Sequence, residues 1–166
     1  MFDLALIARV AEQIANDPLY TYEHAQPGEG GMSPAQRAVH ASQHTRRLCI
    51  GGNQIGKSRI IAAEAWWLSL GRHPFRASPG PGSLGWIVCA DLRAGWPNIS
   101  RKMREIQPPG VLDERCKYDD ARGYTFMGSK MVRTKQGSLI VGKSGTQELI
   151  ALSGATIDWL LFDEIP

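Results

Sequence analysis

The chain has 166 residues, of which 43% are hydrophobic and 21% charged, and its formal net charge is +3. This length suits one domain with a core of its own, and the composition excludes a disordered or low-complexity protein. No apolar run is long enough to span a membrane, and a start that contains Asp3 is unlike a signal peptide. The sequence predicts a folded protein that does not enter a membrane.

Charge is unevenly distributed along the chain. Residues 1–30 hold one basic and five acidic side chains, whereas residues 31–76 hold seven basic and one acidic. A basic block of this kind favours binding to a polyanion, either nucleotide phosphates or nucleic acid. The charge alone leaves both open.

The cysteines predict neither disulfides nor a metal site. Their number is odd, they lie far apart, and none has C-x-x-C spacing. Two of them sit in apolar strand-like runs, so we expect buried free thiols in a reducing cytoplasm. The histidines add no zinc motif to them. These residues are Cys49, Cys89, Cys116, His24, His40, His44 and His73.

Two helices are predicted before the basic block. Residues 2–15 carry an amphipathic pattern that suits packing on the core; its apolar face consists of Phe2, Leu6, Ile7, Val10 and Ile14. After a loop at residues 27–31, Ser33 and Pro34 fit the N-cap and first position of a helix over 34–42. Gln36 on this helix has an amide that suits the N6 and N7 positions of adenine. A solvated glutamine fits the pattern equally well, and Gln43 is a competing candidate.

The next stretch is rich in glycine and reads Gly51, Gly52, Asn53, Gln54, Ile55, Gly56, Lys57 and Ser58. It fits G-x-x-x-x-G-K-[ST], the phosphate-binding P-loop or Walker A motif. Glycines allow successive backbone N–H groups to point at phosphate oxygens, Lys57 suits the β- and γ-phosphates, and the Ser58 hydroxyl suits Mg²⁺. Leu48 to Ile50 read as a buried strand before the loop, and residues 60–70 as a helix after it, ended by Gly71.

Strands and one helix follow. The apolar run at residues 86–90 predicts a second buried strand, and the charged pattern of residues 98–107 predicts an exposed helix. Residues 131–134 and 138–141 read as two strands of a hairpin that turns at 135–137.

Near the end of the chain, the apolar residues 159–162 are followed by Asp163 and Glu164. This pattern is typical of a buried strand that brings carboxylates to the nucleotide end of a sheet. Together with the P-loop it indicates a Walker B motif, in which Asp163 holds Mg²⁺ and Glu164 polarises the attacking water.

These motifs together resemble the N-terminal part of the ATPase domain of a large terminase subunit, the DNA-packaging motor of tailed bacteriophages. The resemblance runs from Ser33 to Pro166 and includes residues 34–42, 51–58, 63–67, 71–76 and 157–166. It implies an α/β fold, a P-loop NTPase core with a mainly parallel sheet flanked by helices, incomplete in this chain. It also implies a helical segment and loop at 1–32, an ATPase domain at 33–166 that ends after Walker B, and no nuclease domain.

The resemblance carries functional expectations as well. Gln36 becomes the family's adenine-recognising glutamine, ATP and Mg²⁺ are the ligands, and hydrolysis drives DNA into a procapsid in the host cytoplasm. The expected partners are double-stranded DNA, the portal protein, the small terminase subunit and further copies of the same chain. Two other interpretations stay open: a helicase-like P-loop translocase, and a truncated prophage product or fragment that only binds nucleotide or a partner protein.

A last expectation concerns the P-loop strand. In ATPases of this kind its neighbouring strands follow Walker B in sequence, so residues 46–50 are left with two open edges. Buried backbone groups without partners cost about 1–3 kcal/mol each. We therefore expect the isolated chain not to be a stable, active monomer, and residues 46–50 to pair with a partner chain, a second copy or a non-native neighbour.

Overall fold

A computed structural model describes residues 8, 11–12, 14–51, 55–145 and 155–163. Four strands form the main sheet in the order β4-β5-β1-β6, and two form a separate antiparallel pair. Within the main sheet β1 pairs in parallel with both β5 and β6, while β4 and β5 are antiparallel. The strands are β1 (Leu84–Cys89), β2 (Cys116–Asp119), β3 (Gly123–Phe126), β4 (Met131–Arg133), β5 (Leu139–Ser144) and β6 (Trp159–Asp163). The α/β fold with a mainly parallel sheet is confirmed.

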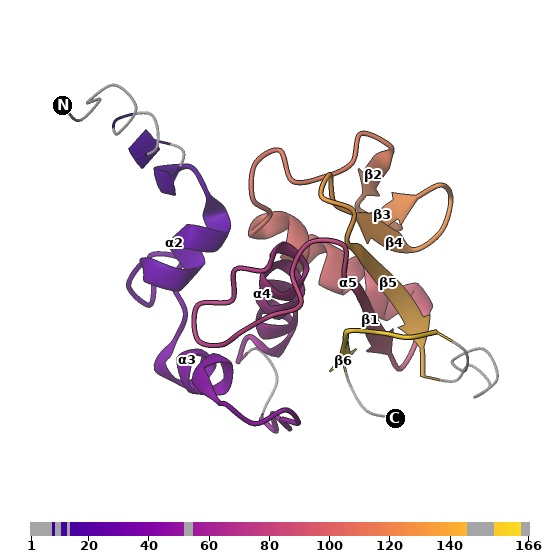
Figure 1. The fold of residues 1–166 in the computed structure, drawn as a ribbon. Coiled ribbons are helices and arrows are strands. Elements are labelled where there is room, and N and C mark those ends of the chain that lie inside the picture. Colours follow the sequence, from indigo (N-terminus) through magenta and orange to yellow (C-terminus); the bar gives the residue numbers. More distant parts are fainter. Residues whose placement is uncertain (1–7, 9–10, 13, 52–54, 146–154, 164–166) are drawn as a thin grey trace.

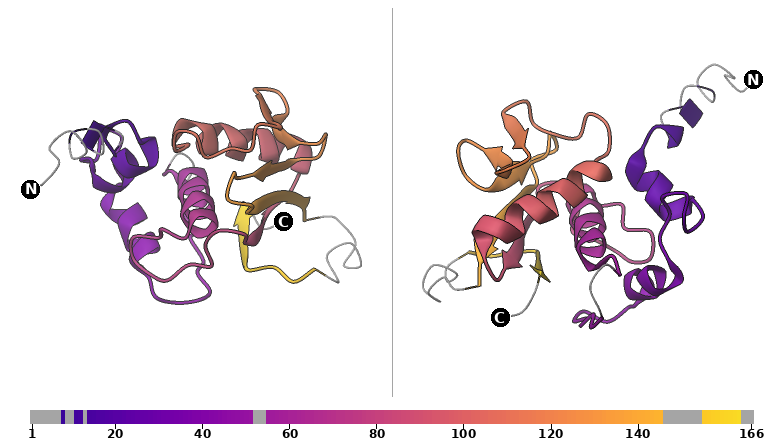
Figure 2. Two further views of the ribbon diagram at one scale, coloured as in Figure 1. Left: turned by 45° about the horizontal axis from the view of Figure 1, so that its top comes forward. Right: turned by 180° about the vertical axis from the view of Figure 1, so that it is seen from behind.

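Helix α4 lies at the centre of the molecule. Figures 1 and 2 show α2 and α3 on one side of it and the sheet on the other, with α5 also against the sheet. This position explains why every residue from Ile60 to Ser69 is buried, since neighbouring elements cover the helix on both sides. The helices are α2 (Pro18–His24), α3 (Pro34–Ala41), α4 (Lys57–Leu70) and α5 (Leu92–Glu105). No helix among the described residues is long and apolar enough to cross a membrane.

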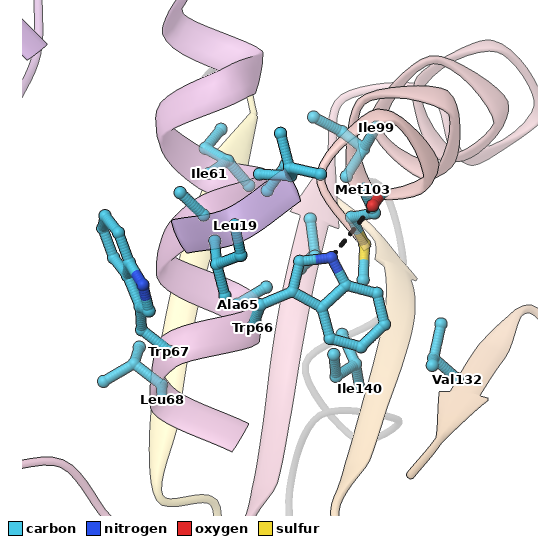
Figure 3. Packing of buried hydrophobic residues seen from close by; sticks show 14 of the residues in the cluster. Leu19, Ile61, Ala65, Trp66, Trp67, Leu68, Ile99, Met103, Val132 and Ile140 are labelled. Atoms are coloured by element: carbon cyan, nitrogen blue, oxygen red, sulfur yellow. Dashed lines mark hydrogen bonds between the residues drawn. The ribbon is translucent and has the colours of Figure 1, made fainter. Parts of the chain in front are cut away.

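Two adjacent tryptophans of α4 face opposite sides of the core. Trp66 packs toward α5 and the sheet, and its indole N–H donates a 2.9 Å hydrogen bond to the Met103 carbonyl (Figure 3). Trp67 packs toward α2 and α3, with its ring centroid 5.9 Å from that of Tyr22. These two large aromatic side chains therefore join α4 to both of its neighbouring layers.

Most of the predicted elements are confirmed. Ser33 caps α3, which begins at Pro34, and the hairpin of β4 and β5 turns where the sequence predicted. The exposed helix predicted over 98–107 is α5; it begins earlier, at Leu92, and buries one face through Trp96, Ile99 and Met103. The helix predicted over 2–15 falls mostly outside the described residues. All three cysteines are free, but only Cys89 is buried.

The predicted strand before the P-loop is wrong. Residues 47–51 form no strand, and Leu48 and Ile50 are 70% and 85% exposed. Residues 46–50 have no strand partner within the described part of the chain, so the expected pairing with a non-native neighbour in the same chain is also wrong, whereas pairing with a partner chain or a second copy stays a prediction. The penalty for unpaired backbone applies to buried groups, and this segment keeps its polar groups in water instead.

The strand that ends in Asp163 is also less buried than predicted. Among the described strands, β6 occupies one edge of the main sheet and pairs only with β1. Its side chains alternate, so that Trp159 is buried whereas Leu160 and Phe162 are 42% and 51% exposed. The predicted strand is confirmed, but it is half-buried at an edge.

Candidate functional site

A glycine of the P-loop lies directly before helix α4. Gly56 is the N-cap of α4 and adopts a left-handed conformation with φ of 86°. This backbone angle favours glycine, and a Cβ atom at this position would lie 2.3 Å from Gln36 Nε2, so that the Gln36 amide would have to move. Among the described residues no side chain caps the first turn of α4, and the positive end of this 14-residue helix faces the loop. Gly52, Asn53 and Gln54 lie outside the described residues.

Lys57 and Ser58 form the first turn of α4. The Lys57 ammonium group donates a 2.7 Å hydrogen bond to the Gly51 carbonyl, so this side chain folds back across the loop. The Ser58 hydroxyl donates to Asp163 Oδ1 at 3.5 Å, although 105 residues separate the two in sequence. The structure therefore brings the two predicted motifs together.

The strand register explains how Asp163 reaches this place. Asp163 is the last residue of β6 and lies opposite Cys89, the last residue of β1, which in turn lies opposite Ser144 on β5. Three parallel strands thus end together, and ligands of open α/β sheets bind beyond the carboxyl ends of such strands. Cys89 and Ser144 were not predicted for this edge, because only the register aligns them with Asp163. Glu164, the next residue, lies outside the described part of the chain.

The donor set fits magnesium. Mg²⁺ takes oxygen ligands, usually from one or two protein groups together with substrate phosphates. A serine hydroxyl and a carboxylate 3.5 Å apart at the positive end of a helix provide these groups beside a place for phosphate. Ser58 and Asp163 are both half-buried, so the site is accessible.

Gln36 lies beside the P-loop, but its amide already has partners. Nε2 donates to the Gly56 carbonyl at 3.4 Å, and Oε1 accepts a 2.8 Å hydrogen bond from the Ser33 backbone N–H. Ser33 in turn caps the N–H of Gln36, which completes a reciprocal capping box. Its competitor Gln43 is exposed and bonds the carbonyls of Ala41 and Phe75. Recognition of a base by Gln36 requires this amide to turn from its present partners.

Sequence reasoning missed a buried polar network around Glu64 on α4. This carboxylate is 2% exposed and receives hydrogen bonds from two histidines and two arginines. The donors are His40 Nδ1 at 2.7 Å, His73 Nε2 at 3.3 Å, Arg47 Nη1 and Nη2 at 3.3 Å each, and Arg76 Nη2. One charged residue within the apolar run of residues 60–70 was the only signal in the sequence.

This network shifts two pKa values. Burial is the main cause that lowers the pKa of His40 below its usual range. Burial alone would raise the pKa of Glu64, but the hydrogen bonds from His40 and His73 and the charge of Arg47 outweigh it, so that this pKa is lowered. At neutral pH the folded protein therefore holds a neutral His40 beside an ionised Glu64.

We expect stability to fall as the pH falls from 7.5 to 5.5. In the unfolded protein His40 takes up a proton near pH 6.5, whereas in the folded protein its lowered pKa keeps it neutral to a lower pH. Lowering the pH therefore stabilises the unfolded state relative to the folded state. The loss is up to about 1.4 kcal/mol over this range, and the lowered pKa of Glu64 adds a further loss of the same sign below about pH 4.5. Chemical denaturation at several pH values measures this loss in the free energy of unfolding.

Two histidine variants test the cause. His40→Asn should flatten the dependence of stability on pH between pH 7.5 and 5.5, whereas His44→Asn, at an exposed position, should not. Equal pH dependence in both variants and the unmodified protein would contradict this.

A solved structure is similar to this chain. No protein-family model matches the chain, and no curated protein matches it. Among solved structures, it is similar to the ATPase domain of the large terminase of Thermus phage P74-26, with a TM-score of 0.51 and 25% sequence identity. The match covers 80% of this chain and 53% of that one, so the chain spans about half of the solved domain. The predicted resemblance to large terminases is confirmed at the level of structure.

Proposed function

We propose that this chain is the ATP-binding part of a viral DNA-packaging motor, the large terminase subunit, in which ATP hydrolysis drives DNA into a procapsid. The observation that carries the proposal is the approach of Ser58 to Asp163 at the start of α4. The likeness to a terminase ATPase domain supports the class of motor. A P-loop fold alone occurs in proteins of many functions, so the proposal depends on both observations.

The proposed roles of the residues are those of the Walker A and Walker B motifs. The backbone of residues 51–58 and the first turn of α4 bind the triphosphate, and Lys57 exchanges the Gly51 carbonyl for a phosphate oxygen. Ser58 and Asp163 hold Mg²⁺, which when bound neutralises charge on the β- and γ-phosphates. Glu164 follows Asp163 and orients the attacking water as a base. Gln36 contacts adenine.

The partners proposed for the whole protein are double-stranded DNA, the portal protein, the small terminase subunit and further copies of the chain, in the cytoplasm of the bacterial host. The basic residues of segment 31–76 are consistent with a polyanionic partner.

ATP turnover with different DNA substrates tests this function. We expect hydrolysis to rise when linear duplex DNA and portal-bearing procapsids are supplied together, because the portal is where packaging begins. Glu164→Gln should lower this turnover by about 10²- to 10⁴-fold, the usual contribution of a general base. Full stimulation by free duplex would indicate a helicase-like translocase instead. Nucleotide binding without turnover under any of these conditions would indicate a binding fragment.

A further inference from the structure

The carboxylate of Glu64 joins four segments of the chain. His40 comes from α3, Glu64 itself from α4, Arg47 from the segment that leads into the P-loop, and His73 and Arg76 from the segment after α4. The side chains of Glu64, His40 and His73 are almost completely buried. Burying polar and charged side chains costs free energy unless each of them has a hydrogen-bond partner. The network is therefore stable only when each of its members has such a partner.

The hydrogen bonds determine the hydrogen positions of both histidines. His73 Nδ1 accepts from the Phe75 backbone N–H at 3.2 Å, so its Nε2 carries the hydrogen that Glu64 accepts. His40 donates from Nδ1 to Glu64, and its Nε2 lies 3.1 Å from the Tyr22 hydroxyl, which donates to it. Both nitrogens of each ring then have a hydrogen-bond partner.

The same atoms have a spacing that a metal ion accepts, but the charges oppose one. One ligand atom each from His40, Glu64 and His73 lie within 4.8 Å of one another. Two of these atoms are nitrogens that carry hydrogens in the network above, and a metal requires them bare. Arg47 and Arg76 also bring two positive charges to the same carboxylate. A dication would have to displace both.

Helix α3 links the network to the proposed nucleotide site. Gln36 and His40 are four residues apart on α3, so they share one face of this helix, and both are buried. Gln36 contacts Gly56, the cap of α4, and His40 contacts Glu64, eight positions further along. At 1.5 Å per residue, these two contacts are about 12 Å apart along the axis of α4. Two separated contacts fix the direction of α3, whereas one would let it pivot.

Glu64 also holds the chain that enters the P-loop. Arg47 bonds both oxygens of Glu64, and its Nη1 donates to the Val39 carbonyl of α3 at 3.1 Å. This arginine precedes Gly51 by four residues. The exit from α3 and the entry to the loop are therefore fastened to the same carboxylate.

We propose that Glu64 is a positioning residue that sets the base preference of the nucleotide site, because it fastens the helix carrying Gln36 to the P-loop helix. The proposal rests on the proposed function, in which Gln36 contacts adenine. Glu64 itself lies too far along α4 to touch the nucleotide. Its effect on base choice must therefore pass through Gln36.

The test compares the affinities of ATP and GTP analogues by calorimetric titration. Glu64→Gln keeps the shape of the side chain but turns an amide toward four donor groups, so α3 should loosen. We expect the ATP:GTP preference to fall to within about twofold of that of Gln36→Ala, since a factor of two is 0.4 kcal/mol. In the double variant the preference should fall no further than in Gln36→Ala. An unchanged preference in Glu64→Gln, or additive losses in the double variant, would overturn the proposal.

Three further variants separate positioning from a general loss of stability. Ile140→Ala makes a cavity in β5, away from α3, and should lower the melting temperature while keeping the preference. His40→Asn keeps a donor where Nδ1 stands and should retain the preference, whereas His40→Leu should lose it. Should Glu64→Gln not fold, the His40 pair decides. Equal loss in Ile140→Ala, or equal behaviour of the two His40 variants, would overturn the proposal.

Hydrogen exchange tests the fastening without any nucleotide. Backbone amides of residues 37–41 should exchange faster in Glu64→Gln, or in His40→Leu, than in the unmodified protein, while those of α5 stay unchanged. Failure of nucleotide binding in the unmodified protein would end the proposed function, and this readout would still decide whether Glu64 holds α3. Unchanged exchange in α3, or one equivalent of zinc in the purified protein that Glu64→Gln loses, would overturn the inference.

Discussion

Lys57→Ala should remove the binding of Mg-ATP and leave the fold intact. The lysine supplies a positive charge to the β- and γ-phosphates, and in the structure its ammonium group donates a hydrogen bond to the Gly51 carbonyl at the surface. Surface substitutions of this kind usually change stability by less than about 0.5 kcal/mol. The loss should therefore appear in binding and not in folding.

Thermal unfolding with an ATP analogue and Mg²⁺ measures this effect. A ligand at 100 times its dissociation constant stabilises a protein by about 2.7 kcal/mol, which for a chain of this size raises Tm by roughly 5–10 °C. Lys57→Ala should show no such rise. Lys117→Ala removes the same charge from an exposed position on β2 and should keep the full rise. Equal rises in Lys57→Ala and the unmodified protein would show that the P-loop lysine does not bind phosphate.

Elements with a local signal were predictable from the sequence. Ser33 and Pro34 mark the start of α3 whatever else surrounds it, because an N-cap and a first-turn proline act within one helical turn. The turn between β4 and β5 is local in the same way. The pairing of Ser58 with Asp163 was predictable as well, since each motif belongs to a known phosphate-binding arrangement.

Features that depend on distant partners were not predictable. Leu48 and Ile50 have the composition of a strand, but a strand needs a neighbour, and no described segment pairs with them. Phe162 has the same kind of exposure, because the apolar pattern of β6 does not say whether the strand is central or at an edge.

The Glu64 network was hidden for a related reason. Its donors come from positions 40, 47, 73 and 76, and no spacing in the sequence links them. Only the packing of α3 and of the segment after α4 against the P-loop helix brings them to one carboxylate. By contrast, the capping box of Ser33 and Gln36 has a sequence signature, and it predicts that the Gln36 amide has a structural partner before any nucleotide binds.

Asp163→Asn should remove the magnesium dependence of nucleotide binding. The carboxylate is 3.5 Å from the Ser58 hydroxyl, and the substitution keeps its shape but removes the negative charge that attracts the ion. Asp120→Asn makes the same change at an exposed residue beyond β2 and serves as the control.

Calorimetric titration of an ATP analogue, with Mg²⁺ and with a chelator, tests the central claim most directly. The unmodified protein and Asp120→Asn should bind one equivalent at least about tenfold more tightly with Mg²⁺, a difference of about 1.4 kcal/mol, and Asp163→Asn should lose this difference. No binding by the unmodified protein, or an affinity that Mg²⁺ does not change, would contradict a Mg-ATP site built from Ser58 and Asp163.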